Sequence, residues 1–88
     1  MTVMVINEDN HGMLAITKDY KSAIDWLVEN DWLTQSSETY DEDAGEFHWM
    51  IDWLGEDWLE KIYKMTLDQF FELNSDFHIH EEPVFGAD

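Results

Sequence analysis

An excess of negative charge is the feature that most restricts what this chain can fold into. Its 88 residues include 21 Asp and Glu against four Lys and Arg together, which gives a formal net charge of −17. Small soluble domains typically carry about 2 to 8 net charges. Charges of one sign repel one another in a compact state, so a folded form of this chain needs a strong apolar core.

The apolar content is high enough to build that core. Acidic chains that lack apolar residues remain disordered, but 44% of this sequence is hydrophobic and 15% is aromatic, with five Trp and five Phe. Each buried aromatic ring removes about 150–250 Å² from water. We therefore expect a single folded domain over residues 1–88. The absence of Cys excludes disulfides and Cys-based zinc sites.

Three short strands are predicted. Residues 3–6 and 13–17 are apolar runs on either side of an Asn-, Asp- and Gly-containing stretch, which is typical of a β-hairpin. Residues 77–80 alternate apolar and polar side chains, as an edge strand does, and we expect regular pairing to end at residues 81–83.

Helical periodicity occupies most of the remaining chain. Residues 18–30 predict a first helix, with Thr17 or Asp19 as its N-cap. Residues 47–65 are expected to be mainly helical, with a break at Gly55, because glycine costs about 1 kcal/mol inside a helix.

A capping box and a polar stretch complete the predicted fold. Thr66 and Gln69 have the spacing of a capping box and open a short helix that ends near Leu73. Residues 34–46 are polar and acidic, which predicts a surface loop. The fold class is therefore α+β: an N-terminal hairpin and a C-terminal strand form a three-stranded antiparallel sheet packed against about three helices.

The acidic residues between 38 and 60 are the candidate partner-binding residues. Asp52, Glu56 and Glu60 are four residues apart, so a continuous helix would align them about 6 Å apart per step. Such a row resembles the regular phosphates of a nucleic-acid strand. The alternative is an ordinary solvated helix face. The nine candidates are Glu38, Asp41, Glu42, Asp43, Glu46, Asp52, Glu56, Asp57 and Glu60.

The charge also indicates the class of partner. A strongly negative protein repels nucleic acid and anionic membranes and attracts proteins with a basic working surface. Since five Trp cannot all be fully buried in so small a domain, a partly exposed Trp beside carboxylates would suit an interface. We expect a basic nucleic-acid-binding protein as the partner, with no direct contact to nucleic acid or membrane.

Other chemistry is less well supported. His78 and His80 share one face of a strand and could hold a metal, but two solvent-facing histidines are the simpler interpretation. No nucleophile motif or phosphate loop is present in the sequence. We therefore expect no enzyme activity, no cofactor and no functional metal site. No signal peptide is recognisable, so we expect a cytoplasmic protein.

Residues 19–33, 54–58 and 77–85 resemble small acidic hypothetical proteins of phages and prophages of Gram-positive bacteria. The resemblance implies an accessory role in the bacterial host cell. It also implies the type of inhibitor that imitates DNA, such as anti-restriction and anti-CRISPR proteins. The first hypothesis is thus a DNA mimic that occupies the basic site of a restriction enzyme or CRISPR effector nuclease. The second is an adaptor that docks through an aromatic patch or through the edge strand at residues 77–80.

Overall fold

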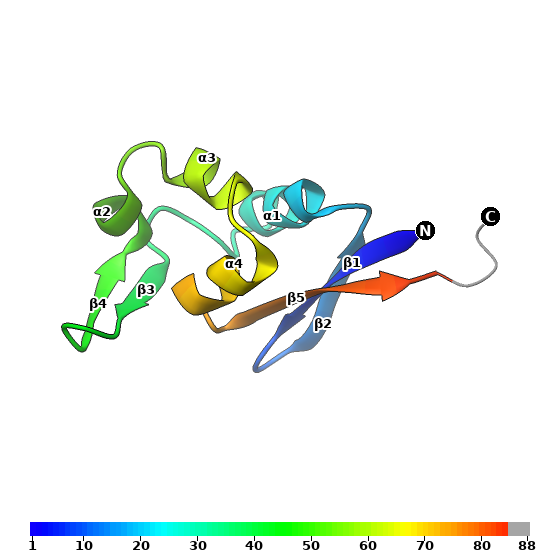
Figure 1. Ribbon diagram of the computed structural model, residues 1–88, viewed down its shortest axis with the longest axis horizontal. Coiled ribbons are helices and arrows are strands. Elements are labelled where there is room, and N and C mark those ends of the chain that lie inside the picture. Colours follow the sequence, from blue (N-terminus) through cyan, green and yellow to red (C-terminus); the bar gives the residue numbers. More distant parts are fainter. Residues whose placement is uncertain (85–88) are drawn as a thin grey trace.

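The computed structural model describes residues 1–84, in which two strands, a helix, two further strands, three helices and a last strand follow one another (Figure 1). In chain order they are β1 (Thr2–Glu8), β2 (Gly12–Thr17), α1 (Tyr20–Glu29), β3 (Glu38–Asp41), β4 (Glu46–Trp49), α2 (Met50–Leu54), α3 (Trp58–Tyr63), α4 (Leu67–Leu73) and β5 (Phe77–Pro83). The α+β class is confirmed.

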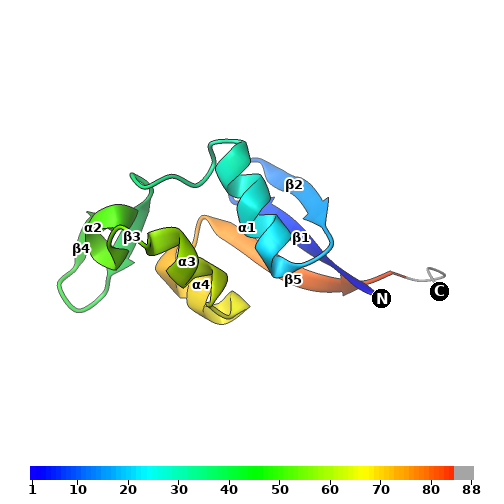
Figure 2. The ribbon, with the colours of Figure 1, turned by 90° about the horizontal axis from the view of Figure 1, so that it is seen from above.

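The main sheet has the strand order β2-β1-β5, and both pairings are antiparallel. Ile6 of β1 pairs with Ala15 and Ile79, and this face is covered by α1 and α4 (Figures 1 and 2). Val5 pairs with Ile16 and His80 on the opposite face, where both partners are exposed. The predicted three-stranded sheet is confirmed.

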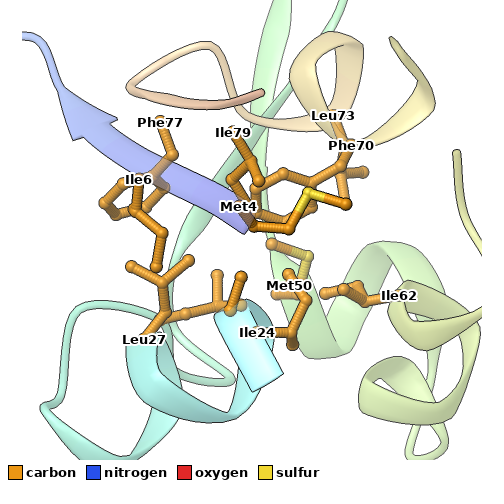
Figure 3. Packing of buried hydrophobic residues seen from close by; sticks show 12 residues of the cluster. Met4, Ile6, Ile24, Leu27, Met50, Ile62, Phe70, Leu73, Phe77 and Ile79 are labelled. Atoms are coloured by element: carbon orange, nitrogen blue, oxygen red, sulfur yellow. The ribbon is translucent and has the colours of Figure 1, made fainter. Parts of the chain in front are cut away.

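The core lies between the main sheet and the helices (Figure 3). Ile24 and Leu27 of α1, Ile62 of α3 and Phe70 of α4 are almost completely buried. Burying such side chains stabilises a fold by about 1.5–3 kcal/mol each, which opposes the repulsion between carboxylates. The full cluster is Met4, Ile6, Ala23, Ile24, Leu27, Leu33, Met50, Ile62, Phe70, Leu73, Phe77 and Ile79.

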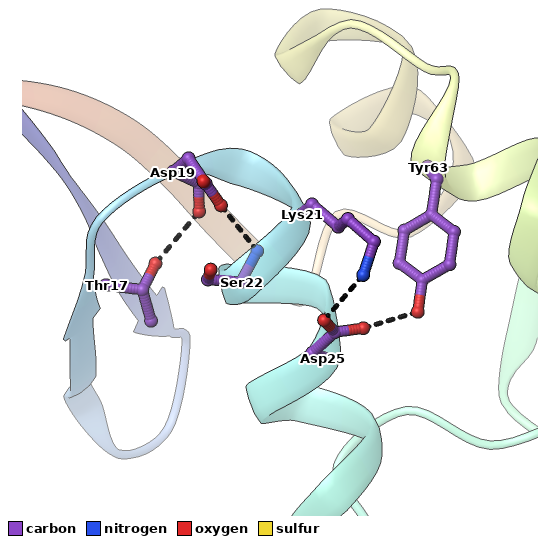
Figure 4. A network of polar contacts seen from close by, with 6 residues as sticks. All are labelled: Thr17, Asp19, Lys21, Ser22, Asp25 and Tyr63. Carbon is purple, nitrogen blue, oxygen red and sulfur yellow. Dashed lines mark hydrogen bonds and ion pairs between the residues drawn. The ribbon is translucent and has the colours of Figure 1, made fainter.

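Polar contacts fix α1 against its surroundings (Figure 4). Of the two predicted caps, Asp19 is the N-cap, and its Oδ1 accepts a hydrogen bond from the Ser22 amide at 2.8 Å. Tyr63 donates a hydrogen bond to Asp25, which also accepts one from Lys21 Nζ at 3.0 Å. The bond from Tyr63 lowers the pKa of the Asp25 carboxyl and raises the pKa of Tyr63 to about 12. The contact between Tyr63 and Asp25 joins α1 to α3.

The helix ends follow the sequence signals. Gly55 has φ 97°, a conformation that favours glycine, and separates α2 from α3 where the break was predicted. The capping box is present, with Thr66 and Gln69 each accepting from the other's backbone amide at N-cap and N3. The strand β5 continues through residues 81–83 to Pro83, which pairs with Thr2, so it is three residues longer than the predicted strand over 77–80.

The region predicted as a surface loop contains a second sheet, which corrects that prediction. β3 and β4 form an antiparallel hairpin in which Tyr40 pairs with Phe47 and Thr39 pairs with His48. The start of the predicted second helix, residues 47–49, is therefore a strand. Thr39 is 1% exposed, so the hairpin has a buried face. The hairpin and α2 form a hairpin lobe (residues 38–54) at one end of the molecule (Figures 1 and 2).

Met50 attaches the hairpin lobe to the rest of the fold. Its side chain is fully buried and points into the core cluster (Figure 3). Its amide donates to the Ser37 carbonyl at 2.7 Å, and the Ile51 amide donates to the Gln35 carbonyl at 2.9 Å. The start of α2 is thereby held on the segment that precedes the hairpin.

Candidate interaction surface

The nine candidate carboxylates lie on the hairpin lobe and on α3 with its preceding turn. Eight of them are exposed, and Asp41 is partly buried. We call residues 38–60 the acidic segment; it contains these nine carboxylates and no Lys. Glu38, Asp41, Glu42, Asp43 and Glu46 come from the hairpin and its turn, and Asp52, Glu56, Asp57 and Glu60 follow it.

Few of these charges are neutralised by neighbours. Within residues 1–84, Asp57 lies 3.3 Å from Lys61 Nζ, and Asp41 lies 3.6 Å from His48 Nε2. In the part of the chain that the structure describes, the other seven carboxylates form no ion pair. The exposed pair between Asp57 and Lys61 contributes at most about 1 kcal/mol. The acidic segment therefore keeps a strong negative field.

The predicted row of carboxylates on one helix is wrong. Asp52 belongs to α2, Glu56 lies between the helices and Glu60 belongs to α3. The positive φ of Gly55 interrupts the helical geometry, so the four-residue spacing does not align these side chains. All three are nevertheless exposed.

Asp41 shapes the tip of the hairpin. Its Oδ1 accepts hydrogen bonds from the Asp43 amide at 3.0 Å and the Ala44 amide at 3.3 Å. Its carbonyl accepts from the Gly45 amide at 2.7 Å, and Gly45 has φ 67°, which glycine adopts without strain. Such bonds between an Asp side chain and the following amides are typical of turns. Asp41 is thus a structural residue of the tip, whereas Glu42, Asp43 and Glu46 are free to face a partner.

The hairpin lobe also exposes large aromatic side chains. Phe47 is 66% exposed, Trp49 55%, Tyr40 48% and Trp53 47%. The expectation that not all five Trp are fully buried is confirmed. Trp53 stacks on His48 with ring centroids 5.0 Å apart, so the two rings support each other outside the core.

A groove runs between the hairpin and α4. It consists of two adjoining hollows of about 410 and 240 Å³. Tyr40, Glu42, Glu72 and Leu73 line both hollows, so the two hollows lie side by side. We call this feature the hairpin groove. Its other lining residues are Trp53, Leu54, Met65 and Gln69 in the larger hollow, and Glu38, Phe47, Phe71, Asn74, Ser75 and Asp76 in the smaller.

Sequence reasoning did not include the α4 side of this groove. Phe71 is 40% exposed, while its neighbour Phe70 is 1% exposed. Glu72 and Asp76 are exposed as well and add carboxylates opposite those of the hairpin. Two adjacent Phe residues in a helix cannot both face one core, so the pair Phe70-Phe71 was the available signal.

His78 and His80 both lie exposed on β5. His78 Nε2 lies 3.4 Å from Asp9, and His80 Nε2 lies 2.9 Å from Glu82. The two histidines thus contact different carboxylates. Over residues 1–84, no group of three or more His, Asp or Glu side chains is arranged to hold a metal ion.

In comparisons with known proteins, no protein-family model, curated protein or solved structure matches this chain. Among the helices of residues 1–84, none is long and apolar enough to span a membrane.

Proposed function

We propose that this protein binds a basic nucleic-acid-binding protein in the place of nucleic acid and so inhibits it. One observation carries the proposal: the acidic segment exposes eight of its nine carboxylates and contains no Lys. Nucleic-acid-binding sites are lined by Lys and Arg that neutralise phosphates. A dense set of exposed carboxylates offers the same charge to those side chains.

The inhibition would be electrostatic and steric. The Cα trace extends 47 Å along its longest axis and 25 and 22 Å across it. This shape, with the acidic segment reaching one end, suits insertion into an elongated basic channel. A restriction enzyme or a CRISPR effector nuclease of a bacterial host is the class of partner that we propose, consistent with a phage or prophage accessory protein.

Competition with nucleic acid tests this proposal. The immobilised protein is used to capture its partner from a bacterial lysate, and double-stranded DNA or RNA is then added in increasing amounts. We expect nucleic acid to displace the partner, and the complex to weaken steeply with salt. A partner that binds this protein and nucleic acid at the same time, with neither weakening the other, would falsify the proposal.

Charge reversal identifies the surface that is used. Asp43→Lys and Glu56→Lys alter exposed side chains of the acidic segment and should slow association with the captured partner. Glu29→Lys is the matched control, because Glu29 is exposed at the end of α1, outside the acidic segment. Equal losses for all three variants would mean that only total charge matters.

The exposed aromatic residues favour a second candidate function. An adaptor would dock through the exposed aromatic side chains of the hairpin lobe, such as Phe47 and Tyr40, which do not belong to the core. Such docking depends on apolar contact and changes little with ionic strength. A complex that persists unchanged from 50 to 500 mM NaCl would support the adaptor and contradict the mimic.

A further inference from the structure

The hairpin groove combines two kinds of side chain that are usually kept apart. Tyr40 and Phe47 of the hairpin and Phe71 of α4 all line the smaller hollow, and all three are at least 40% exposed. The Phe71 ring also contacts His78 of β5, with centroids 4.6 Å apart. Exposed apolar side chains that lie together often mark an interaction site, whereas single exposed apolar side chains are common on any surface. The rings of Tyr40 and Phe47 are 5.0 Å apart and tilted by 50°, so their faces are not fully used against each other.

Carboxylates surround these rings. Glu38 and Glu42 come from the hairpin side, and Glu72 and Asp76 from the α4 side. All four are exposed, and no Lys is among the residues described as lining either hollow. An anionic or purely apolar occupant would leave these charges uncompensated. The charge complementarity requires a cation.

We propose that the hairpin groove binds an extended peptide segment that carries Arg side chains. A guanidinium stacks on aromatic faces and forms paired hydrogen bonds with a carboxylate, and the groove offers both partners within one hollow. The ammonium of Lys is a compact, strongly hydrated charge that stacks less well. Because the two hollows adjoin and share Tyr40 and Glu72, an extended segment can place successive side chains in them.

The inference rests on the proposed function in one respect: the segment belongs to the same basic partner that the acidic segment attracts. The hairpin groove would add specific contacts to the non-specific electrostatic attraction of the acidic segment. Charge alone steers many basic proteins to this surface, whereas an aromatic and carboxylate groove selects those with an accessible Arg-containing strand or tail.

Peptide binding tests the groove directly and needs no partner protein. The probes are a fluorescein-labelled (Arg-Gly)4 peptide and its (Lys-Gly)4 counterpart, titrated with the protein at 150 mM NaCl and followed by fluorescence polarisation. We expect the Arg peptide to bind at least about fivefold more tightly than the Lys peptide of equal charge. Equal affinities, or no binding of the Arg peptide at millimolar protein, would overturn the inference.

Variants locate the binding site. Phe47→Ala and Phe71→Ala should each weaken the Arg peptide by about five- to tenfold and leave the Lys peptide nearly unchanged. Met13→Ala removes a 61% exposed side chain of β2 outside the groove and should have no effect. Glu72→Gln should weaken binding more than Glu29→Gln, although both remove one charge near a helix end. If the groove variants match their controls, the attraction is general and the inference is wrong.

The two proposals fail in different ways. If the Arg peptide does not distinguish the groove variants but nucleic acid still displaces the captured partner, the groove inference fails and the mimic stands. If the peptide binds as expected but the captured partner holds nucleic acid simultaneously, the mimic fails and the groove remains a peptide-binding site. Circular dichroism confirms that each variant is folded before either result is used.

Discussion

The body of the molecule and its hairpin lobe differ in how far their large apolar side chains are buried. The body, built from β1, β2, β5, α1, α3 and α4, buries Ile6, Ile24, Phe70 and most of the core. The hairpin lobe contributes only Met50 to the core cluster of residues 1–84, and it exposes Phe47 and its other large aromatic residues. The body therefore holds the fold, and the lobe displays a surface.

Charge is also unevenly divided, and six of the nine carboxylates of the acidic segment lie in the hairpin lobe. All four Lys residues lie outside the acidic segment, and the ion pair between Lys21 and Asp25 belongs to α1. The excess negative charge is therefore not spread evenly over the chain. An even distribution would be enough if the charge served only solubility. The charge is concentrated where aromatic side chains are also exposed.

The largest expected effect is a loss of stability when a Phe of the body, but not a Phe of the lobe, is replaced by Ala. Phe70→Ala removes a buried ring of the body and should lower the free energy of unfolding by about 3–5 kcal/mol. Phe47→Ala removes a ring that is 66% exposed on the lobe and should change it by no more than about 0.5 kcal/mol. Urea denaturation followed by Trp fluorescence measures both. A large loss for Phe47→Ala would mean that the lobe is part of the folding core.

Salt should raise stability by a smaller amount. We expect the thermal midpoint in 0.5 M NaCl to lie several degrees above that in 10 mM NaCl, because screening weakens repulsion among the carboxylates. One kcal/mol corresponds to about 4–8 °C for a domain of this size. Combining Asp43→Lys with Glu56→Lys should reduce this salt effect more than Glu29→Lys does. An unchanged midpoint in salt would show that self-repulsion is not significant.

Thr39 provides a test of the contact between the hairpin and its support. Its hydroxyl is buried, and within residues 1–84 it has no hydrogen-bond partner. A buried polar group without a partner costs about 1–3 kcal/mol. Thr39→Val keeps the shape and the β-branched side chain, so we expect a gain of about 1 kcal/mol in the free energy of unfolding. Thr2→Val, at an exposed strand position, is the control. A loss of stability for Thr39→Val would mean that the hydroxyl is satisfied in solution.

The body could be predicted from the sequence because its signals are local and repeated. The apolar face of α1 recurs with the helical period, Asp19 and Thr66 have the spacing of caps, and Gly55 marks a break. The strands of the main sheet are apolar runs bounded by turn residues. Each signal is independent of where distant residues lie.

The hairpin lobe could not be predicted in the same way. β3 and β4 have four residues each, too few for alternation to stand out among acidic neighbours. Tyr40 and Phe47 flank a turn that Asp41 and Gly45 form, and these were the local clues. The hairpin groove needs Phe71 from α4 to approach the hairpin, which is a tertiary fact. The partner-binding role of the nine carboxylates stays a prediction.

The smallest expected effect is a pH dependence of stability that comes from Glu8, a carboxylate of the body with a structural role. Glu8 is 9% exposed, and its Oε2 accepts hydrogen bonds from the amides of Asn10 and His11, both at 2.9 Å, and lies 2.7 Å from His11 Nδ1. The hydrogen bond with the His11 side chain is the largest of the effects that lower the pKa of Glu8; burial opposes them. The folded state therefore holds this proton less tightly than the unfolded state does.

The sign of the pH dependence follows from that difference. A lowered pKa contributes stability that is present above the ordinary value of about 4.3 and is lost as the pH falls through the folded value. Between pH 6 and pH 3, the wild type should lose this contribution, while Glu8→Gln should lack it at every pH. Glu42→Gln removes an exposed carboxylate of the lobe and should follow the wild-type profile, shifted only by the reduced repulsion. Thermal unfolding at micromolar concentration, which limits precipitation near the pI of about 4.1, measures the three profiles. If Glu8→Gln and Glu42→Gln had the same profile, body and lobe carboxylates would be equivalent, and the division between a holding body and a displaying lobe would not extend to charge.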